Sequence, residues 1–241
     1  RQTGIGFVFS DAGMKAFAKK NEQLNVLTGL LNSAVATLAL RSLSETLNFE
    51  QGQIANIPVN LEVDCLVDKL VDRSKTDWDC QEISWDYSIH SILAFATSHQ
   101  RSSDCWGEWK IESDRRIREI IALEEENNRI FINAYGLQDE LSPEVPEDQI
   151  TLTRADREKD CQRLISYAIG CMMGRYSLDA PGLIYAHAGN VGFDPSRYTR
   201  FAADADGILP VTDEHWFADD APERIREFLL AVWGPDTLEE N

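Results

Sequence analysis

The stretch from Leu30 to Val59, LLNSAVATLALRSLSETLNFEQGQIANIPV, contains the clearest change of pattern in the chain. It begins inside an apolar period that runs from about Glu22 to Leu43 and predicts a helix. A polar turn rich in Asn and Gln, Asn48 to Asn56, then breaks that period. Ile57-Pro58-Val59 follows as an edge strand or an extended connector, because proline has no amide hydrogen to donate within a sheet.

Helical patterns dominate the rest of the chain. Acid-before-base pairs four residues apart, such as Glu112–Arg116, Asp114–Arg118 and Glu125–Arg129, support one long helix. A short alternating run, Ile5 to Phe9, predicts a strand. The fold class is therefore mainly α with a few short strands. The further predicted helices cover residues 61–72, 88–98 and 103–134, a segment that starts at Thr153–Asp156, and a last one between Pro222 and Gly234.

Composition places the chain among ordinary globular proteins. Hydrophobic residues make up 43% and charged residues 27% of its 241 residues. No apolar run approaches the roughly 20 residues that a membrane span needs, so no membrane partner is expected. The five cysteines form no C-x-x-C pair, which favours a reduced, cytoplasmic protein without structural zinc. The start, Arg1 to Gly4, has neither an initiator Met nor a signal-peptide pattern and suits an excised fragment.

The formal net charge of −18 is unevenly distributed. Residues 1–60 carry five basic and four acidic side chains, whereas residues 61–241 carry 18 basic and 37 acidic ones. Proteins grip the polyanionic DNA duplex largely through Lys and Arg, so any DNA contact is expected in the first 60 residues. The acidic remainder also has a simpler interpretation, because a negative surface keeps proteins soluble.

The motifs of group-transfer and hydrolytic enzymes are missing. The chain has no Pro-Pro pair and hence no D/N-P-P-Y/F loop, which holds a flipped base in amino-methyltransferases. It also lacks a P-loop, H-E-x-x-H and G-x-S-x-G. Gly4 to Phe7 is only a faint echo of a Gly-rich turn, and Asp64, Asp68 and Lys69 fit a solvated helix face better than a nuclease site. No catalytic, cofactor-binding or metal-ligating residue is therefore predicted.

The polar turn after the first helix offers chemistry suited to DNA. Amide side chains donate and accept hydrogen bonds together, which matches the major-groove edge of adenine, although such residues also form ordinary turns. Nearby lysines can contact phosphate groups. The predicted DNA-contact residues are Asn48, Gln51, Gln53, Asn56, Lys15, Lys19 and Lys20.

The segments L-L-N-S-A-V and T-L-N-F-E-Q-G-Q-I-A-N-I-P-V resemble the target-recognition tail of large adenine-specific DNA methyltransferases, in particular the PglX family of bacteriophage-exclusion (BREX) systems. Departures from the family pattern are Gln81, where an aromatic residue is expected, and Cys80 in place of Ser. Further stretches with the same likeness, in order along nearly the whole chain, are residues 77–86, 124–145, 165–183 and 206–217.

The resemblance implies a parent enzyme that transfers a methyl group from S-adenosylmethionine to adenine N6, with its catalytic motifs upstream of this region. Residues 1–60 would then complete a target-recognition region, residues 61–136 would form a helical spacer, and residues 137–241 an acidic α-rich C-terminal module. The chain itself would be non-catalytic, would hold no cofactor, and would position double-stranded DNA and dock other defence-system subunits. The alternative is an acidic protein-interaction scaffold that does not contact DNA.

Two features outside the first 60 residues have competing interpretations. Trp78 and Trp85 are surrounded by acids, which favours core or interface anchors over base-stacking platforms. An acidic loop could bind a cation or a basic partner patch, although a simply solvated loop is favoured. Its residues are Asp204, Asp206, Asp213, Glu214, Asp219 and Asp220.

Overall fold

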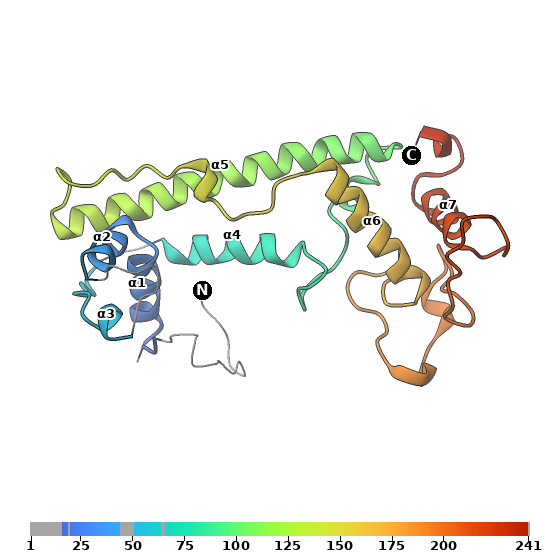
Figure 1. Ribbon diagram of the computed structural model, residues 1–241, viewed down its shortest axis with the longest axis horizontal. Helices are drawn as coiled ribbons and strands as arrows, with labels where there is room; N and C mark the ends of the chain where they lie inside the picture. The colour runs from blue at the N-terminus through green and yellow to red at the C-terminus, as the bar shows by residue number, and fades with distance from the viewer. Residues whose placement is uncertain (1–15, 19, 44–50, 64–65, 241) are drawn as a thin grey trace. The chain divides into compact units, whose positions relative to one another are not determined.

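A computed structural model describes residues 16–18, 20–43, 51–63 and 66–240. The mainly α prediction is confirmed, since helices dominate these residues and none of them lies in a β-strand. Ile57-Pro58-Val59 is an irregular connector, and the predicted strand Ile5 to Phe9 lies outside the described residues. The α-helices in Figure 1 are α1 (Asn21–Leu31), α2 (Ala34–Leu43), α3 (Gln51–Ala55), α4 (Val67–Asp79), α5 (Ser102–Tyr135), α6 (Arg157–Met172) and α7 (Ala221–Trp233).

The chain folds into two compact units, each built from two separate segments. Unit 1 comprises residues 1–75 and 116–152, and unit 2 comprises residues 76–115 and 153–241. Each unit therefore depends on packing between two segments that are far apart in the sequence. The three-part division by role remains a prediction, because packing does not reveal role.

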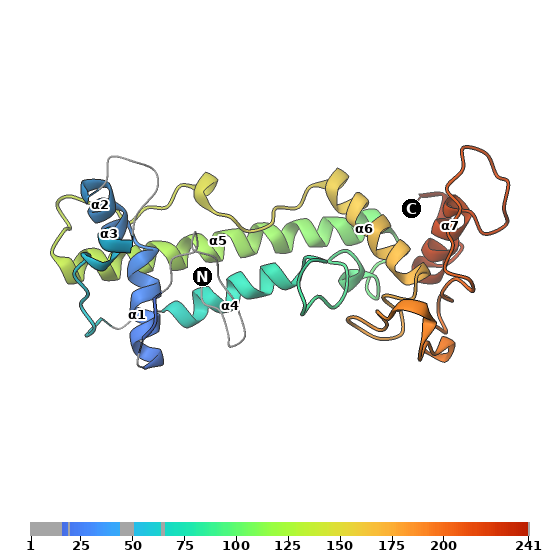
Figure 2. The ribbon, with the colours of Figure 1, turned by 60° about the horizontal axis from the view of Figure 1, so that its bottom comes forward.

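In unit 1, helices α1, α2 and α3 gather beside the later half of α5 (Figures 1 and 2). The apolar side chains between these helices are removed from water, which stabilises the unit. The core they form consists of Val26, Leu30, Val35, Ala36, Leu40, Ile57, Phe131 and Ile132.

The predicted single helix over residues 22–43 is wrong at one point, because α1 and α2 meet at a 66° bend. Ser33 causes the break. Its buried hydroxyl donates to the Leu30 carbonyl at 2.7 Å and accepts from the Ala36 amide at 3.4 Å, which ends one helix and caps the next. The Ala34 amide donates to Asn128 Oδ1 at 2.8 Å, so the corner is fixed to α5.

Among the described residues, no single helix is long and apolar enough to cross a membrane. Only the bent pair Glu22–Leu31 and Ala34–Leu43 passes that test jointly.

Two further helix predictions need correction. Helix α4 spans Val67–Asp79 rather than residues 61–72, because the preceding segment is held in a turn. Asn60 Oδ1 accepts from the Glu62 amide at 3.0 Å, and the Asn60 amide donates to the Tyr135 hydroxyl at 3.1 Å. The segment 88–98 contains only a short 3-10 turn, Leu93–Phe95.

The proline-rich segment after α5 is an ordered return along that helix. Figures 1 and 2 show residues 137–152 running back beside α5. The Asn128 amide donates to the Pro143 carbonyl at 3.1 Å. Ile150 and Leu152 then pack on an apolar strip where α4 and α5 lie side by side, formed by Leu70, Ile117, Ile120 and Ile121.

Unit 2 packs α6 and α7 with the first part of α5. The predicted start of α6 is confirmed, since Asp156 caps it by accepting from the Lys159 amide at 3.2 Å. Asp220 caps α7 in the same way through the Glu223 amide at 3.1 Å, and Gly234 ends that helix at a positive φ of 81°. The core includes Tyr87, Ile92, Cys105, Trp109, Tyr167, Met172 and Phe228.

Candidate functional site

The predicted DNA-contact residues that the structure describes lie just before α1, within α3 and just after α3, all in unit 1. Gln51 is the first residue of α3, but its side chain is not among those described. Lys15, Lys19 and Asn48 lie outside the described residues, so their roles remain predictions. Lys20, Gln53 and Asn56 can be placed.

The side chains of Gln53 and Asn56 differ in their contacts and in their exposure. The half-buried Gln53 donates from Nε2 to the Leu43 carbonyl at 3.2 Å, which ties α3 to the end of α2. Asn56 follows α3, is exposed, and donates its backbone amide to the Gln53 carbonyl at 3.2 Å. Gln53 therefore shapes the turn, while Asn56 presents an amide side chain to solvent. Lys20 is exposed on a separate element, in the extended residue that precedes α1.

An apolar hollow of about 220 Å³ lies between α1 and α3. Because every lining residue is apolar, the hollow offers no side-chain polar group to a nucleotide and suits an apolar group better. Its walls are Ala16, Leu27, Leu30, Leu31, Ile54, Ala55, Ile57 and Val59.

Helix α1 approaches α5 closely at Gly29. A Cβ there would lie 2.8 Å from Phe131 and 2.9 Å from both Asn127 Oδ1 and Val67, so only glycine fits. Asn127 is buried and donates from Nδ2 to the Gly29 carbonyl at 3.0 Å. Its Oδ1 has no hydrogen-bond partner among the described atoms. This contact fixes α1, and with it Lys20, on the core of unit 1.

Unit 2 contains a buried carboxylate at the start of α6. Asp160 Oδ2 accepts from the indoles of Trp106 at 3.2 Å and Trp109 at 3.1 Å, and from the Asp156 amide at 3.0 Å. Asp160 Oδ1 accepts from Arg163 at 2.9 Å. All these donors are internal, so the carboxylate is a structural group that joins α5 to α6.

His90 lies close to this carboxylate and stays neutral. Burial lowers the pKa of His90 to about 4, although the charge of Asp160 acts in the opposite direction. The Ile92 amide donates to His90 Nδ1 at 3.3 Å, which fits a neutral ring with an acceptor nitrogen. A buried, neutral histidine of this kind contributes to the core and is a weak base.

Glu82 organises a second polar cluster. It accepts from the Ser166 hydroxyl at 2.8 Å and the Tyr176 hydroxyl at 3.2 Å, and its Oε1 lies 3.6 Å from the Arg175 guanidinium. Burial raises the pKa of the neighbouring Cys171 thiol to about 12, so that thiol is not a nucleophile at neutral pH. The contacts of Glu82 join residue 82 to the second half of α6 and the turn that follows it.

Gln81 and Cys80, the two residues that depart from the family pattern, form hydrogen bonds with nearby groups of unit 2. Gln81 donates from Nε2 to the Thr153 hydroxyl at 3.0 Å, and the buried Asp77 accepts from the Thr153 amide at 3.1 Å. Cys80 lies 3.3 Å from the Thr76 carbonyl. Trp85 is not a core residue, since its side chain is 100% exposed, and its role as an interface anchor stays a prediction. Sequence could not show this difference in exposure, because the half-buried Trp78 and the exposed Trp85 have similar acidic neighbours.

A second hollow lies in unit 2, against α5, α6 and α7. The hollow in unit 2 measures about 230 Å³, below the roughly 300–1,000 Å³ usual for small-molecule sites, and its lining is chiefly apolar around Trp106, Leu164 and Phe228. It has no Gly-rich turn to approach S-adenosylmethionine. Within the described part of the chain, no three His, Cys, Asp or Glu side chains could hold a metal ion.

Comparison with known proteins shows which proteins the chain is similar to. The chain is 37% identical over 250 residues to "Adenine-specific methyltransferase PglX" of Lacticaseibacillus casei (strain Zhang), a match that covers 100% of this chain and 20% of that protein. It is 32% identical over 259 residues to "Adenine-specific methyltransferase BrxX" of Escherichia coli O9:H4 (strain HS), covering 98% of this chain and 21% of that protein. The resemblance to the PglX family is confirmed.

The chain thus spans about a fifth of the length of the curated relatives that it matches. No protein-family model matches it. The match runs through both units, so the polar turn around α3 and the acidic loop before α7 belong to the same homologous region.

Proposed function

We propose that this chain is a non-catalytic part of an adenine-specific DNA methyltransferase, and that it positions double-stranded DNA and docks partner subunits. The observation that carries this proposal is the match of the whole chain to two adenine-specific methyltransferases. The parent would act in the cytoplasm in BREX phage defence, with its catalytic motifs and S-adenosylmethionine site upstream.

The DNA-positioning role belongs to unit 1. Asn56 carries an exposed amide suited to a base edge, and Lys20 carries an exposed ammonium group suited to phosphate. The core contacts of Gly29 and Ile57 hold the two elements that bear these side chains. We infer that DNA contacts unit 1 through these two residues, together with Lys15, Lys19, Asn48, Gln51 and Gln53.

A titration of the chain with a labelled random-sequence duplex, repeated over a salt series, tests the DNA role. Replacing Lys15, Lys19 and Lys20 together by Gln should weaken binding and reduce the salt slope by about 0.9 for each phosphate contact that is lost. Lys20→Gln and, in unit 2, Lys159→Gln form the matched pair, since each removes one positive charge, and only Lys20→Gln should weaken binding. If wild-type chain does not bind the duplex at any salt concentration, the DNA role is refuted.

That same negative result would favour the scaffold function. Unit 2 supports it independently, because it carries 24 acidic and 12 basic residues and exposes several large apolar side chains. Calorimetry with S-adenosylmethionine addresses the non-catalytic assignment. The proposal expects no heat of binding, and measurable affinity of this chain for the cofactor would contradict it.

A further inference from the structure

The loop before α7 exposes an unusual set of apolar side chains. We call residues 204–219 the acidic arm. Ile208 is 64% exposed, Val211 82%, Trp216 71% and Phe217 49%. Single exposed apolar residues are common on protein surfaces, but several large ones in one short loop mark an interaction site more often than a random surface.

Internal hydrogen bonds hold the acidic arm in a defined shape. At its start the Asp204 amide donates to the Met172 carbonyl at 2.6 Å, and Asp204 Oδ1 accepts from the Asp206 and Gly207 amides at 3.1 and 2.8 Å. Further along, the Ala221 amide donates to the Pro210 carbonyl at 2.9 Å, which brings the two ends of residues 211–220 together. A loop closed in this way is pre-organised, so binding costs less ordering entropy.

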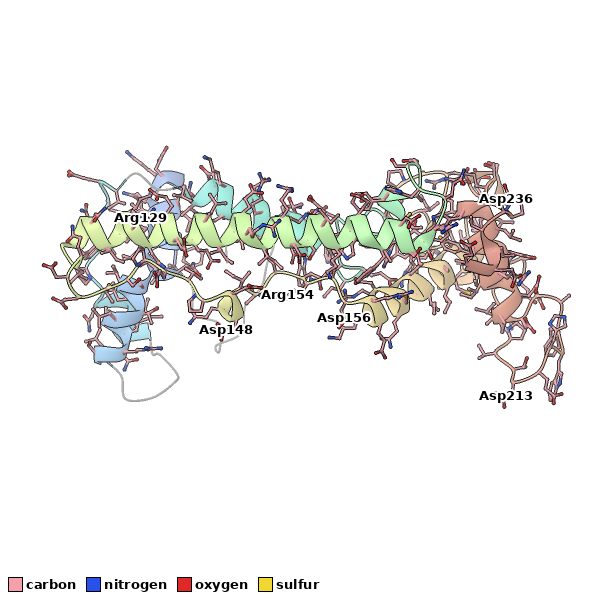
Figure 3. The ribbon with its side chains drawn as sticks, turned by 90° about the horizontal axis from the view of Figure 1, so that it is seen from above. Arg129, Asp148, Arg154, Asp156, Asp213 and Asp236 are labelled. Carbon is pink, nitrogen blue, oxygen red and sulfur yellow. The ribbon has the colours of Figure 1, made fainter. Side chains whose placement is uncertain are left out.

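The arm also projects from the unit that carries it. Leu209 packs against the core of unit 2, whereas Asp213 lies at the outer end of the loop, away from α7, as Figure 3 shows. The Trp216 indole donates from Nε1 to Glu214 Oε2 at 3.2 Å. Its polar atom is therefore already engaged, and the exposed ring faces are left for apolar contact.

The negative charge of the acidic arm indicates which kind of partner surface it can bind. Residues 201–223 contain seven acidic residues and no Lys or Arg. Asp204 and Asp220 hold the loop and cap α7, whereas Asp213 and Asp219 are exposed and make no ion pair or hydrogen bond with the described residues. Such a surface repels DNA and attracts Lys- and Arg-rich proteins.

We propose that the acidic arm docks a basic protein surface that has an apolar recess for the Trp216 indole. Tryptophan at the centre of a contact often dominates its affinity, and surrounding charges raise the association rate and fix the partner's orientation. This inference rests on the docking half of the proposed function and names the chemistry of the partner.

Calorimetric titration of the chain with a synthetic amphipathic helix made of Leu and Lys tests the proposal. The helix supplies both positive charge and an apolar face. Trp216→Ala should weaken its binding about tenfold or more, because an exposed anchor is removed without loss of core contacts. Trp85→Ala removes an even more exposed indole, 100% against 71%, from another loop and should leave the affinity unchanged.

Charge and apolar contributions are separated by two further titrations. Replacing Asp213 and Asp219 by Asn should weaken binding at low salt and flatten its salt dependence. A Gly/Lys peptide with the same number of lysines should bind far more weakly than the Leu/Lys helix. Equal binding of the two peptides, or wild-type affinity in Trp216→Ala, would contradict the proposal that the acidic arm docks a basic protein surface. Neither result bears on DNA binding by unit 1, which the lysine variants test separately.

Discussion

The polar turn around α3 and the acidic arm before α7 are both short, side-chain-rich surface segments, yet they differ in charge and in what they leave exposed. The first is preceded by lysines and exposes the amide of Asn56. The second has no Lys or Arg over residues 201–223 and exposes Trp216 and Phe217. The first suits a polyanion, and the second suits a basic protein surface.

The comparison teaches that net charge alone is a poor guide to the function of a chain. A total of −18 argues against DNA binding, and both units are acidic, with 11 basic and 17 acidic residues in unit 1 and 12 and 24 in unit 2. Residues 1–60, however, carry five basic and four acidic side chains. Each unit also has its own core, so the two surface segments depend on different packing contacts. Variants that weaken one core should separate the two activities.

The largest effect is expected from Asp160→Ala in unit 2. The change leaves the buried Trp109 indole and the Asp156 amide without an acceptor, which should reduce the free energy of unfolding of unit 2 by about 4 kcal/mol. Urea denaturation followed by tryptophan fluorescence measures the loss. Binding of the Leu/Lys helix should fall with it. Loss of DNA binding to the same extent would break the proposed separation of the two units.

Acid should also weaken unit 2, through His90. Its folded pKa of about 4 lies below the unfolded value near 6.5, so the folded unit binds fewer protons. The stabilisation is complete above about pH 6.5 and is lost as the pH falls toward 4, by about 3 kcal/mol at roughly 1.4 kcal/mol per pKa unit. His90→Gln should flatten this pH dependence in urea titrations, whereas the exposed His187→Gln should not.

Unit 1 should respond to Gly29→Ala. The new methyl group would meet Phe131, Asn127 and Val67 at 2.8–2.9 Å, and overpacking of this kind costs about 2 kcal/mol. Hydrogen exchange of α1 and α2 should accelerate, and DNA affinity should fall. Gly52→Ala in α3 is the matched control, because a Cβ there meets no atom within 4 Å. Equal damage from both substitutions would contradict the close-packing argument.

The smallest effect is expected at the α1–α2 corner. Ser33→Ala removes the hydroxyl that accepts from Ala36 and donates to Leu30, which should cost about 1 kcal/mol. Ser42→Ala removes an exposed hydroxyl bonded to the Leu38 carbonyl and serves as the comparison. Thermal unfolding of both variants measures the difference, and identical midpoints would show that Ser33 does not fix the corner.

Much of the helical structure could be predicted from local patterns. The long helix α5 and the helices α6 and α7 follow from apolar periodicity and from Asp156, Pro222 and Gly234, whereas the cap at Asp220 was not predicted. The break at Ser33 could not be predicted, because it depends on a contact with Asn128, which lies 94 residues away. The late start of α4 has a similar cause, since Tyr135 holds Asn60 in the preceding turn.

The candidate surfaces were predictable only in part. Residue type marked Asn56 and Lys20 as suited to DNA, but sequence could not show that Gln53 bonds the Leu43 carbonyl. The acidic character of the arm was visible in the sequence. The exposure of Trp216 was not, because burial depends on which groups the folded chain places beside the ring. The hydrogen bond of Gln53 and the exposure of Trp216 both depend on how the chain folds, which local sequence patterns do not show.

Hydrogen exchange of the chain with each ligand in turn tests the central claim most directly. With duplex DNA, the account predicts protection of amides in α1 and α3 and none in the acidic arm. With the Leu/Lys helix, it predicts protection of residues 204–219 and none around α3. Protection of the arm by DNA, or of the same amides by both ligands, would contradict the division of DNA and protein contacts between the two units.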